Sequence, residues 1–541
     1  MSDKKNNMLV QAAILTFAGI LVRIIGILYR SPLTAIIGDE GNGIYSAAYN
    51  IYTMILLIAS YSIPSAISKV IAGKLALKQY KNAHRVFQCA LIYVLIVGGT
   101  ASLLTFIFAP VLVNPTAVIP LRILSPAIFL SGILGVFRGY FQAYHSMLQT
   151  SVSQIIEQII NAAVSIGAAY FLTKAYIGTA SSDKVPLYGA AGSTMGTVAG
   201  VIFALLFMLF VYQLNRSYFR KKLRRDRSTS VESYSTIFKT IFSMVTPVIF
   251  STFIYNISTS LDMKIYFNIC MDVKHWSESV TSIQYGIFSG KYILITNIPI
   301  AFASAMSSAI IPNVSASFAK EDFEAAREKV AQAIRFTMLI AIPAFMGISI
   351  LSYPIVWLLF PQPESMQMAS NLIQFGGISV VFYSLSTLTN GVLQGIGKVN
   401  IPVKNAIIAL FIHLGVLVPL LYFTDYDLYV LVLANITYSL TMCILNGFSV
   451  RKHLNYRQEI KKTFVIPVLA TLIMGFVTWL TYFGSFILIN SNIISLCISI
   501  PASCLVYFVA MIKLKGITEE DLRSFPKGGA LTRLAKKMHL L

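Results

Sequence analysis

Charged side chains interrupt several long apolar stretches of this chain. The cations are Arg23, Arg30, Lys69, Arg138, Lys264 and Lys291, and the acids are Glu157 and Asp262. A charge at the centre of a lipid bilayer costs roughly 2.5–3.5 kcal/mol on insertion scales, so such a residue is expected to face water or a partner. Because arginine offers paired donors to phosphate oxygens, the excess of cations indicates a site that binds an anionic, phosphate-bearing group.

The two acids allow two interpretations. Glu157 and Asp262 could form ion pairs that neutralise the cations while the site is empty, or they could carry a proton or a sodium ion. Structural pairing is favoured because a buried charge is usually matched by an opposite one. The sequence leaves the second role open.

No residue pattern indicates covalent catalysis. His413 stands alone in an apolar stretch, so a hydrogen-bonded packing role is favoured over that of a base. The run at 395–398 (GIGK) lacks the length and the Ser or Thr of a phosphate-binding loop, and the five cysteines show no metal-like spacing. We therefore predict a protein without catalytic residues, metal or cofactor.

The composition excludes an ordinary soluble enzyme. Of the 541 residues, 56% are hydrophobic and 12% are charged, against roughly 25% charged in soluble domains. The mean hydropathy is +0.73. A formal net charge of +21 would point to nucleic acid in a soluble protein, but cytoplasmic loops of membrane proteins collect Lys and Arg. We therefore expect a membrane protein without a nucleic-acid partner.

The apolar stretches predict an all-α integral membrane protein with about fourteen spans of about 20 residues each. The spans begin near Met8, Ile44, Phe87, Val118, Thr150, Leu187, Ile237, Gln284, Val330, Asn371, Ile401, Leu428, Phe464 and Ile493. No small-residue cleavage site follows the first stretch, so we expect it to stay as a span rather than to be removed as a signal peptide.

Charge in the loops predicts the orientation. With an even number of spans and both termini inside, every second loop should be basic. The predicted inner loops hold Lys74, Lys78, Lys81, Arg85 and the cluster from Arg216 to Arg227, whereas the opposite loops hold Asp39, Glu40, Asp272 and Glu278. This alternation predicts a multi-pass protein of the plasma membrane with cytoplasmic N- and C-termini.

The two halves of the chain resemble each other weakly. Ile63-Pro64 corresponds to Ile311-Pro312, the run at 80–83 to that at 323–326, and the run at 139–142 to that at 391–394. Six spans separate the paired elements, so the repeats run in the same direction through the membrane. This layout predicts two pseudo-symmetric six-helix bundles around a central cavity, followed by two extra helices.

The expected domains follow this repeat. They are a first bundle at 1–215, a basic cytoplasmic linker at 216–235, a second bundle at 236–455, two further spans at 456–515 and a basic amphipathic tail at 516–541. We expect the linker to be a solvated loop beside anionic lipid headgroups. The tail is expected to lie as a helix on the inner membrane surface.

Three segments carry a resemblance to a known family. The run at 38–45 (GDEGNGIY) follows the first span, Ile63-Pro64 and Ser68-Lys69 lie on the second, and the run at 138–158 crosses the fourth and fifth. These segments resemble the polysaccharide-biosynthesis exporters of the MOP superfamily, and within it the lipid II flippase (MurJ) branch with its YtgP and stage V sporulation protein B types. The resemblance covers essentially the whole chain.

The resemblance implies a mechanism and a set of site residues. The headgroup of a lipid-linked substrate would cross the bacterial cell membrane through the central cavity by alternating access, while the two extra helices would hold its polyprenyl tail. Arg23 and Arg30 match a pair of arginines on the family's first span, and Lys291 lies about one turn from a further arginine position. Dependence on the membrane potential or on a monovalent cation stays open.

Residues and resemblance together predict a transporter rather than an enzyme. The expected substrate is lipid II, the undecaprenyl-pyrophosphate-linked peptidoglycan precursor, moved from the inner to the outer leaflet by a functional monomer. Membrane lipids and the cell-wall synthesis or division machinery are the expected partners.

Four other functions fit the sequence to different degrees. Export of another lipid-linked oligosaccharide, such as a teichoic acid, capsule or spore polymer unit, fits the same residues. A polyprenyl-linked glycosyl- or acyltransferase would need a carboxylate or histidine beside a long outer loop. A drug/cation antiporter would favour an acidic cavity, and a scaffold would not explain charges within spans.

Overall fold

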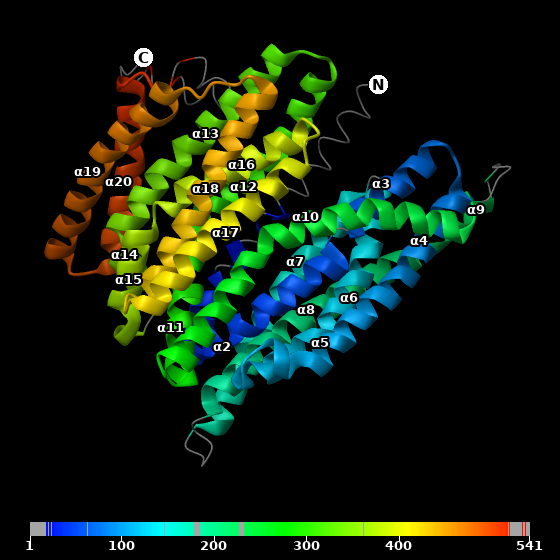
Figure 1. Cartoon of the computed structure of the whole chain (residues 1–541), viewed down its shortest axis with the longest axis horizontal. Coiled ribbons are helices and arrows are strands. Elements are labelled where there is room, and N and C mark those ends of the chain that lie inside the picture. The colour runs from blue at the N-terminus through cyan, green and yellow to red at the C-terminus, as the bar shows by residue number, and fades with distance from the viewer. Residues whose placement is uncertain are drawn as a thin grey trace. The chain divides into compact units, whose positions relative to one another are not determined.

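A computed structural model shows the chain as helical throughout the part that it describes. It describes residues 18, 19, 21, 22, 24–26, 28–61, 63–144, 146–177, 184–224, 226, 232–360, 362–517, 519, 533 and 536. The chain divides into two compact units, Met1–Gly286 and Ile287–Leu541. Figure 1 shows the helices of both units, coloured along the chain.

The first unit is a bundle of long apolar helices with one short basic helix. Its helices are α2 (Arg30–Leu56), α3 (Ile63–Ala76), α4 (Tyr80–Tyr93), α5 (Gly99–Leu112), α6 (Val118–Ala143), α7 (Met147–Tyr176), α8 (Val185–Leu214), α9 (Arg216–Arg224), α10 (Tyr234–Asn268) and α11 (Glu278–Ile287). A π-helical turn at Val94–Gly98 joins α4 to α5, so these two helices form one span.

Helix α2 reverses direction at Gly38. This residue has φ 68° and ψ −176°, a conformation that is essentially restricted to glycine. The Arg30 guanidinium lies 5.0 Å from the ring centre of Tyr45, whereas fifteen residues of straight helix would separate them by about 22 Å. The end of the predicted first span therefore folds back beside the start of the second.

Glycines let other helices of the first unit meet backbone to backbone. A Cβ atom built on Gly139 of α6 would lie 2.7 Å from the Pro64 carbonyl oxygen of α3. The backbone of α11 at Ser282 leaves no room for a Cβ on Gly43 of α2. All three segments that carry the family resemblance therefore include a place where helices cross closely.

A longer glycine stripe on α8 packs against α7, which lies beside it in Figure 1. Cβ atoms on Gly192, Gly196 and Gly200 would lie 2.5–2.6 Å from backbone atoms of α7. Small residues at every fourth position are typical of membrane helices that pack closely. The stripe holds α7 at the turn that carries Glu157, because the atom nearest Gly200 is the Glu157 carbonyl oxygen.

The second unit repeats the helix contacts of the first. Its helices are α12 (Ile293–Ala319), α13 (Phe323–Ile350), α14 (Ser352–Leu359), α15 (Pro363–Gly376), α16 (Ser379–Gly395), α17 (Asn400–Phe423), α18 (Leu428–Leu454), α19 (Ile466–Ile489) and α20 (Asn492–Lys513). α12 packs on α16, α16 on α18 and α17 on α18, as α3 packs on α6, α6 on α8 and α7 on α8. Gly391 and Gly395 meet α12 at Ser307 and Ile311, so the repeat found in the sequence is also present in the packing.

The predicted all-α membrane fold is confirmed, but the count of fourteen spans is not. In the described ranges, 10 helices are long and apolar enough to span a membrane, or 11 if the bent pair α15 and α16 is one span. Every predicted span start from Ile44 onward lies in a helical segment. Helix α10 is not among the 10. The first span lies mostly outside the described residues.

The boundary between the compact units differs from the predicted domain boundary. The sequence placed it at the basic linker 216–235, but α10 packs on α2, α3 and α4 and so clusters with the first unit. The extent of a compact unit depends on which helices pack together and not on the charge of the segment that connects them. The predicted tail at 516–541 lies almost entirely outside the described residues.

Apolar side chains cover the outside of both units. Val111 of α5 is 71% exposed and Phe476 of α19 is 65% exposed. Helices α19 and α20 pack side by side (Figure 1), and each is apolar enough to span a membrane. Lipid is the solvent that such a surface requires.

The glycine stripe makes a prediction about stability. Gly196→Ala should lower the thermal stability of the purified protein, because overpacking costs about 1–3 kcal/mol and the new Cβ would lie 2.5 Å from the Asn161 carbonyl oxygen. Gly167→Ala on α7 is the matched control, since nothing lies within 4 Å of its Cβ position. Size-exclusion chromatography after heating measures both variants. Equal melting temperatures for the two would contradict the packing argument.

Candidate functional site

The reversal of α2 builds a cluster of arginine and tyrosine side chains. Arg30 is half-buried and faces the ring of Tyr45, which is 2% exposed. The ring of Tyr49 stacks on Tyr45 at 5.3 Å and contacts the ring of Tyr52 at 5.6 Å. An aromatic face stabilises a guanidinium ion without neutralising it, so Arg30 keeps its full positive charge.

A second arginine is held by an ion pair. Arg138 Nη2 on α6 lies 2.7 Å from Glu157 Oε2 on α7, and Arg138 Nε donates a hydrogen bond of 2.9 Å to Ser153 Oγ. The side chains are 14% and 31% exposed. Two of the five N–H donors of the guanidinium group are used in this way.

Helix packing places the two arginines in the same unit. Tyr49 stacks on the ring that Arg30 faces. Helix α2 packs on both α6 and α7, and the backbone at Gly26 approaches the side chain of Gln158. The cluster holds two guanidinium groups against one carboxylate, which is the charge balance of an anion site. We refer to Arg30, Tyr45, Tyr49, Arg138 and Glu157 as the arginine cluster.

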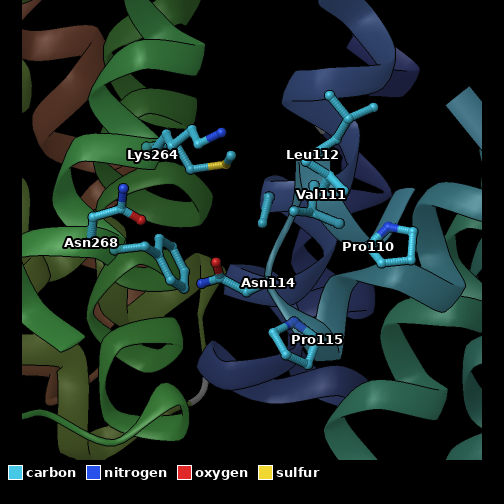
Figure 2. A pocket seen from close by; sticks show the side chains of 11 residues that line it. Pro110, Val111, Leu112, Asn114, Pro115, Lys264 and Asn268 are labelled. Carbon is cyan, nitrogen blue, oxygen red and sulfur yellow. The ribbon is translucent and has the colours of Figure 1, made fainter. Parts of the chain in front are cut away.

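Lys264 lies apart from the arginine cluster. It lines a cavity of about 270 Å³ that is formed by residues of α2, α5, α10 and the turn after α5. Figure 2 shows Lys264 and Asn268 on one wall and Asn114 with Pro115 on the other. The cavity wall does not include Arg30, Arg138 or Glu157. Asp262 is half-buried on the same helix as Lys264.

The remaining predicted cations have different surroundings. Lys69 is exposed on α3, and Arg23 lies outside the described residues. Lys291 belongs to the second unit, where it is fully buried, donates a hydrogen bond to Ser365 Oγ and lies 5.8 Å from the ring centre of Phe360. The structure therefore pairs Arg138 with Glu157 and places Arg30 against Tyr45 on a helix that packs on both of theirs, and the binding roles of all the predicted residues stay predictions.

His413 is packed rather than open. Its ring is 1% exposed, with Nδ1 2.8 Å from the Ala434 carbonyl oxygen and with the edge of the ring against Tyr438. Among the described residues, no group of three or more His, Cys, Asp or Glu side chains could hold a metal ion.

An arginine in the middle of α13 forms an ion pair within the second unit. Arg335 Nη2 lies 2.7 Å from Glu459 Oε2, beyond the end of α18. Burial and the neighbouring Glu459 raise the pKa of Tyr456 in the same loop to about 12, although Arg335 opposes the shift. The Tyr456 hydroxyl therefore stays protonated at physiological pH, and this group adds no charge to the loop.

Sequence analysis missed the tyrosines and the glycine stripe. Tyr45, Tyr49 and Tyr52 are spaced by four and three residues, which places them on one face of a helix. The spacing of Gly192, Gly196 and Gly200 was an equally readable signal for close packing. Neither pattern indicates by itself which helix lies opposite.

Two family descriptions match this chain. "Polysaccharide biosynthesis protein" matches residues 9–318, and "MatE" matches residues 291–418. The chain belongs to the polysaccharide biosynthesis protein family. The resemblance seen in segments 38–45 and 138–158 is thereby confirmed.

Relatives of this polysaccharide biosynthesis protein match it over nearly its full length. The lipid II flippase MurJ of Bacillus subtilis (strain 168) is 24% identical over 480 residues, which cover 85% of this chain and 86% of the relative. Stage V sporulation protein B of the same organism is 24% identical over 545 residues, which cover 97% and 99%.

Solved structures show the same fold. A lipid II flippase MurJ in an inward closed conformation aligns with a TM-score of 0.67 and 17% identity, over 92% of this chain and 98% of that one. An inward-facing multidrug resistance MATE family transporter of the MOP superfamily aligns with a TM-score of 0.66 and 16% identity, over 83% and 98%. This member of the family is therefore a multi-pass membrane transporter and not an enzyme, as predicted.

The ion pair of the arginine cluster can be measured by a double-mutant cycle. We expect Arg138→Gln and Glu157→Gln each to lower thermal stability, and the double variant to lose less than the sum, with a coupling of about 0.5–3 kcal/mol. The comparison pair is Arg335–Glu459, whose carboxylate side chain is 42% exposed, so that water screens it and its coupling should be smaller. Additive losses at 138 and 157 would contradict the pairing.

The reversal of α2 can be tested at Gly38. Gly38→Ala should destabilise the protein by about 1–3 kcal/mol, because a side chain disfavours this backbone conformation. Gly73→Ala on α3 is the control, since it has open space for a Cβ and no unusual φ. Thermal unfolding of both purified variants gives the comparison, and a Gly38→Ala variant as stable as Gly73→Ala would refute the constraint.

Proposed function

We propose that this transporter moves a lipid-linked glycan across the membrane and that its substrate is lipid II. The observation that carries the proposal is the arginine cluster, in which Arg138 pairs with the Glu157 carboxylate and Arg30 faces the ring of Tyr45. Nearly full-length matches to MurJ and to stage V sporulation protein B support the choice of a lipid-linked substrate.

The pyrophosphate of lipid II fits the chemistry of the cluster. Each guanidinium group can bind two phosphate oxygens in parallel. In the absence of substrate, Glu157 occupies Arg138 and lowers the net charge. A pyrophosphate carries more negative charge than one carboxylate. It can therefore replace Glu157 as the partner of Arg138 and bind Arg30 as well.

Transport of this kind needs no covalent step. The second unit repeats the helix contacts of the first, and in parallel-repeat transporters such halves rock against each other around a central site. We propose that the substrate headgroup crosses between them while its polyprenyl tail stays in lipid. The termini lie in the cytoplasm in this scheme, and the functional unit is a monomer.

The membrane potential could drive this movement. An anion that leaves an inside-negative cell gains roughly 2.3 kcal/mol per charge and 100 mV. Because the substrate is anionic, this gain favours transport from the inner to the outer leaflet without a coupling ion. A monovalent cation bound at Glu157 or Asp262 is the alternative source of energy, and cell-wall enzymes are the proposed partners that would use the product.

A second substrate class has support of its own. Stage V sporulation protein B matches over 97% of this chain and 99% of its own length. The runner-up is therefore export of another lipid-linked oligosaccharide, such as a teichoic acid, capsule or spore polymer unit. The pyrophosphate end of such a substrate would use the same two arginines.

A complementation experiment tests the function. The chain is expressed in a strain depleted of its lipid II flippase, and a leaflet-specific probe measures how much lipid II reaches the outer leaflet. Wild type should restore export, and Arg138→Ala should reduce it about ten- to hundredfold, since a hydrogen bond to a charged group is worth about 1.5–3 kcal/mol.

Arg122→Ala is the matched control for this experiment. Arg122 lies on the same helix as Arg138 and donates a hydrogen bond of 3.3 Å to the Phe106 carbonyl oxygen, away from the cluster, so export should stay near wild type. Trapped lipid II despite normal amounts of wild-type protein would refute lipid II as the substrate. Accumulation of a different polyprenyl glycan after deletion of the native gene would favour the runner-up.

A further inference from the structure

The basic helix α9 is anchored to the bundle rather than loose in solution. Phe219 is 5% exposed, and its ring lies 5.0 Å from Tyr140, 5.2 Å from Tyr144 and 5.6 Å from Tyr212. These tyrosines belong to the ends of α6 and α8. Burial of one aromatic ring fixes the side of α9 that faces the protein.

A cage of tyrosines holds the same side of α9. The Lys222 ammonium lies 5.6 Å from the ring centre of Tyr80, 5.1 Å from Tyr144 and 4.8 Å from Tyr218. Rings on several sides of one ammonium are a strong cation–π arrangement. Phe219 and Lys222 together set the rotation of α9 about its axis.

The acids of the linker are occupied elsewhere. Between residues 216 and 235 the sequence has only Asp226 and Glu232 as acids. The carboxylate of Asp226 accepts a hydrogen bond from the Lys81 backbone N–H, and that of Glu232 pairs with Lys74. The Glu232 carbonyl oxygen accepts a hydrogen bond of 2.8 Å from Arg85. These contacts fasten the linker to α3 and α4.

The other side of α9 carries a stripe of cations. Arg216, Arg220 and Arg224 recur at every fourth residue, and Lys221 lies beside them. With Gln213 and Ser217 they line a groove of about 430 Å³. The described part of the chain gives none of these four cations a hydrogen bond or an ion pair. We refer to Arg216, Arg220, Lys221 and Arg224 as the α9 stripe.

The position and length of the α9 stripe limit its ligand. Helix α8 is a membrane span that ends at Leu214, which is 65% exposed, and Tyr218 beside it is 48% exposed. The α9 stripe therefore lies where hydrocarbon meets water. It extends over about 12 Å, which is long enough for several phosphate groups and too long for one.

We propose that the α9 stripe is a preorganised binding site for anionic phospholipid headgroups on the membrane face where α8 ends. Anchoring by Phe219 and Lys222 distinguishes it from a flexible basic loop, because the four cations are held in one groove before any lipid arrives. The site goes beyond the proposed transport function and does not depend on the identity of the transported glycan.

Retention of lipid by the full-length protein tests the proposal. The purified chain is reconstituted in nanodiscs with equal amounts of phosphatidylglycerol and phosphatidylcholine, and native mass spectrometry counts the lipids that stay bound. Wild type should retain phosphatidylglycerol selectively. In the variant R216Q/R220Q/R224Q, the ratio of retained phosphatidylglycerol to phosphatidylcholine should fall at least about fivefold. In K320Q/K398Q/K404Q this ratio should stay at the wild-type value. The control removes the same charge from three exposed lysines of the second unit.

Two further variants test the preorganisation. Phe219→Ala and Tyr218→Ala keep every cation of the α9 stripe but weaken its anchoring, so both should retain less phosphatidylglycerol than wild type. The exposed Tyr218 provides the test if Phe219→Ala does not fold. Wild-type selectivity in Tyr218→Ala, or an equal loss in the lysine control, would overturn the proposal in favour of unspecific attraction to basic loops.

Competitors distinguish the sources of phosphate. Inorganic pyrophosphate or undecaprenyl diphosphate is added at the same phosphate concentration as phosphatidylglycerol. We expect neither to displace the phospholipid at this ratio. Displacement by pyrophosphate would show a site for soluble anions, and displacement by undecaprenyl diphosphate would show a loading site for polyprenyl substrates; either result would overturn the assignment to phospholipid.

Discussion

A guanidinium group among membrane helices must have a partner, and this constraint shapes the arginine cluster. Arg138 meets it with one carboxylate and one hydroxyl, and Arg30 meets it with a tyrosine ring. Both arrangements hold the charge in place without satisfying all its donors. This intermediate degree of compensation keeps the cluster stable, because an unpaired arginine would destabilise the fold.

Close contacts between helix backbones make the cluster possible. Arg30 reaches Tyr45 only because α2 reverses at Gly38, and Glu157 reaches Arg138 from a helix that is held by the glycines of α8. In lipid, helices gain little from the hydrophobic effect on packing together, so small residues that let backbones approach supply much of the stabilisation. The glycines that let the helices pack therefore also position the side chains of the arginine cluster.

The same bundle supports chemistry at its surface. The aromatic cluster around Tyr140 and Tyr144 packs the ends of α6 and α8, and it also receives Phe219 and Lys222 of α9. A region that looks in sequence like a polar connection is thus a fixed part of the first unit. This arrangement places a strongly basic surface at the end of α6, the helix that also carries Arg138 of the arginine cluster.

Composition, hydropathy and the weak repeat were enough to determine a helical membrane protein with two similar halves, because lipid admits only a few backbone arrangements and the periodicity of apolar residues reports them directly. The excess of cations over acids likewise indicated an anionic ligand. Tertiary structure alone decided the surroundings of each charge. Arg138 pairs with Glu157, Lys291 donates a hydrogen bond to Ser365, and Lys264 lines a separate cavity. The physical reason is that hydropathy is a property of each segment, whereas the pairing of two side chains depends on how helices distant in sequence cross, and here glycine contacts such as Gly139 on Pro64 set those crossings.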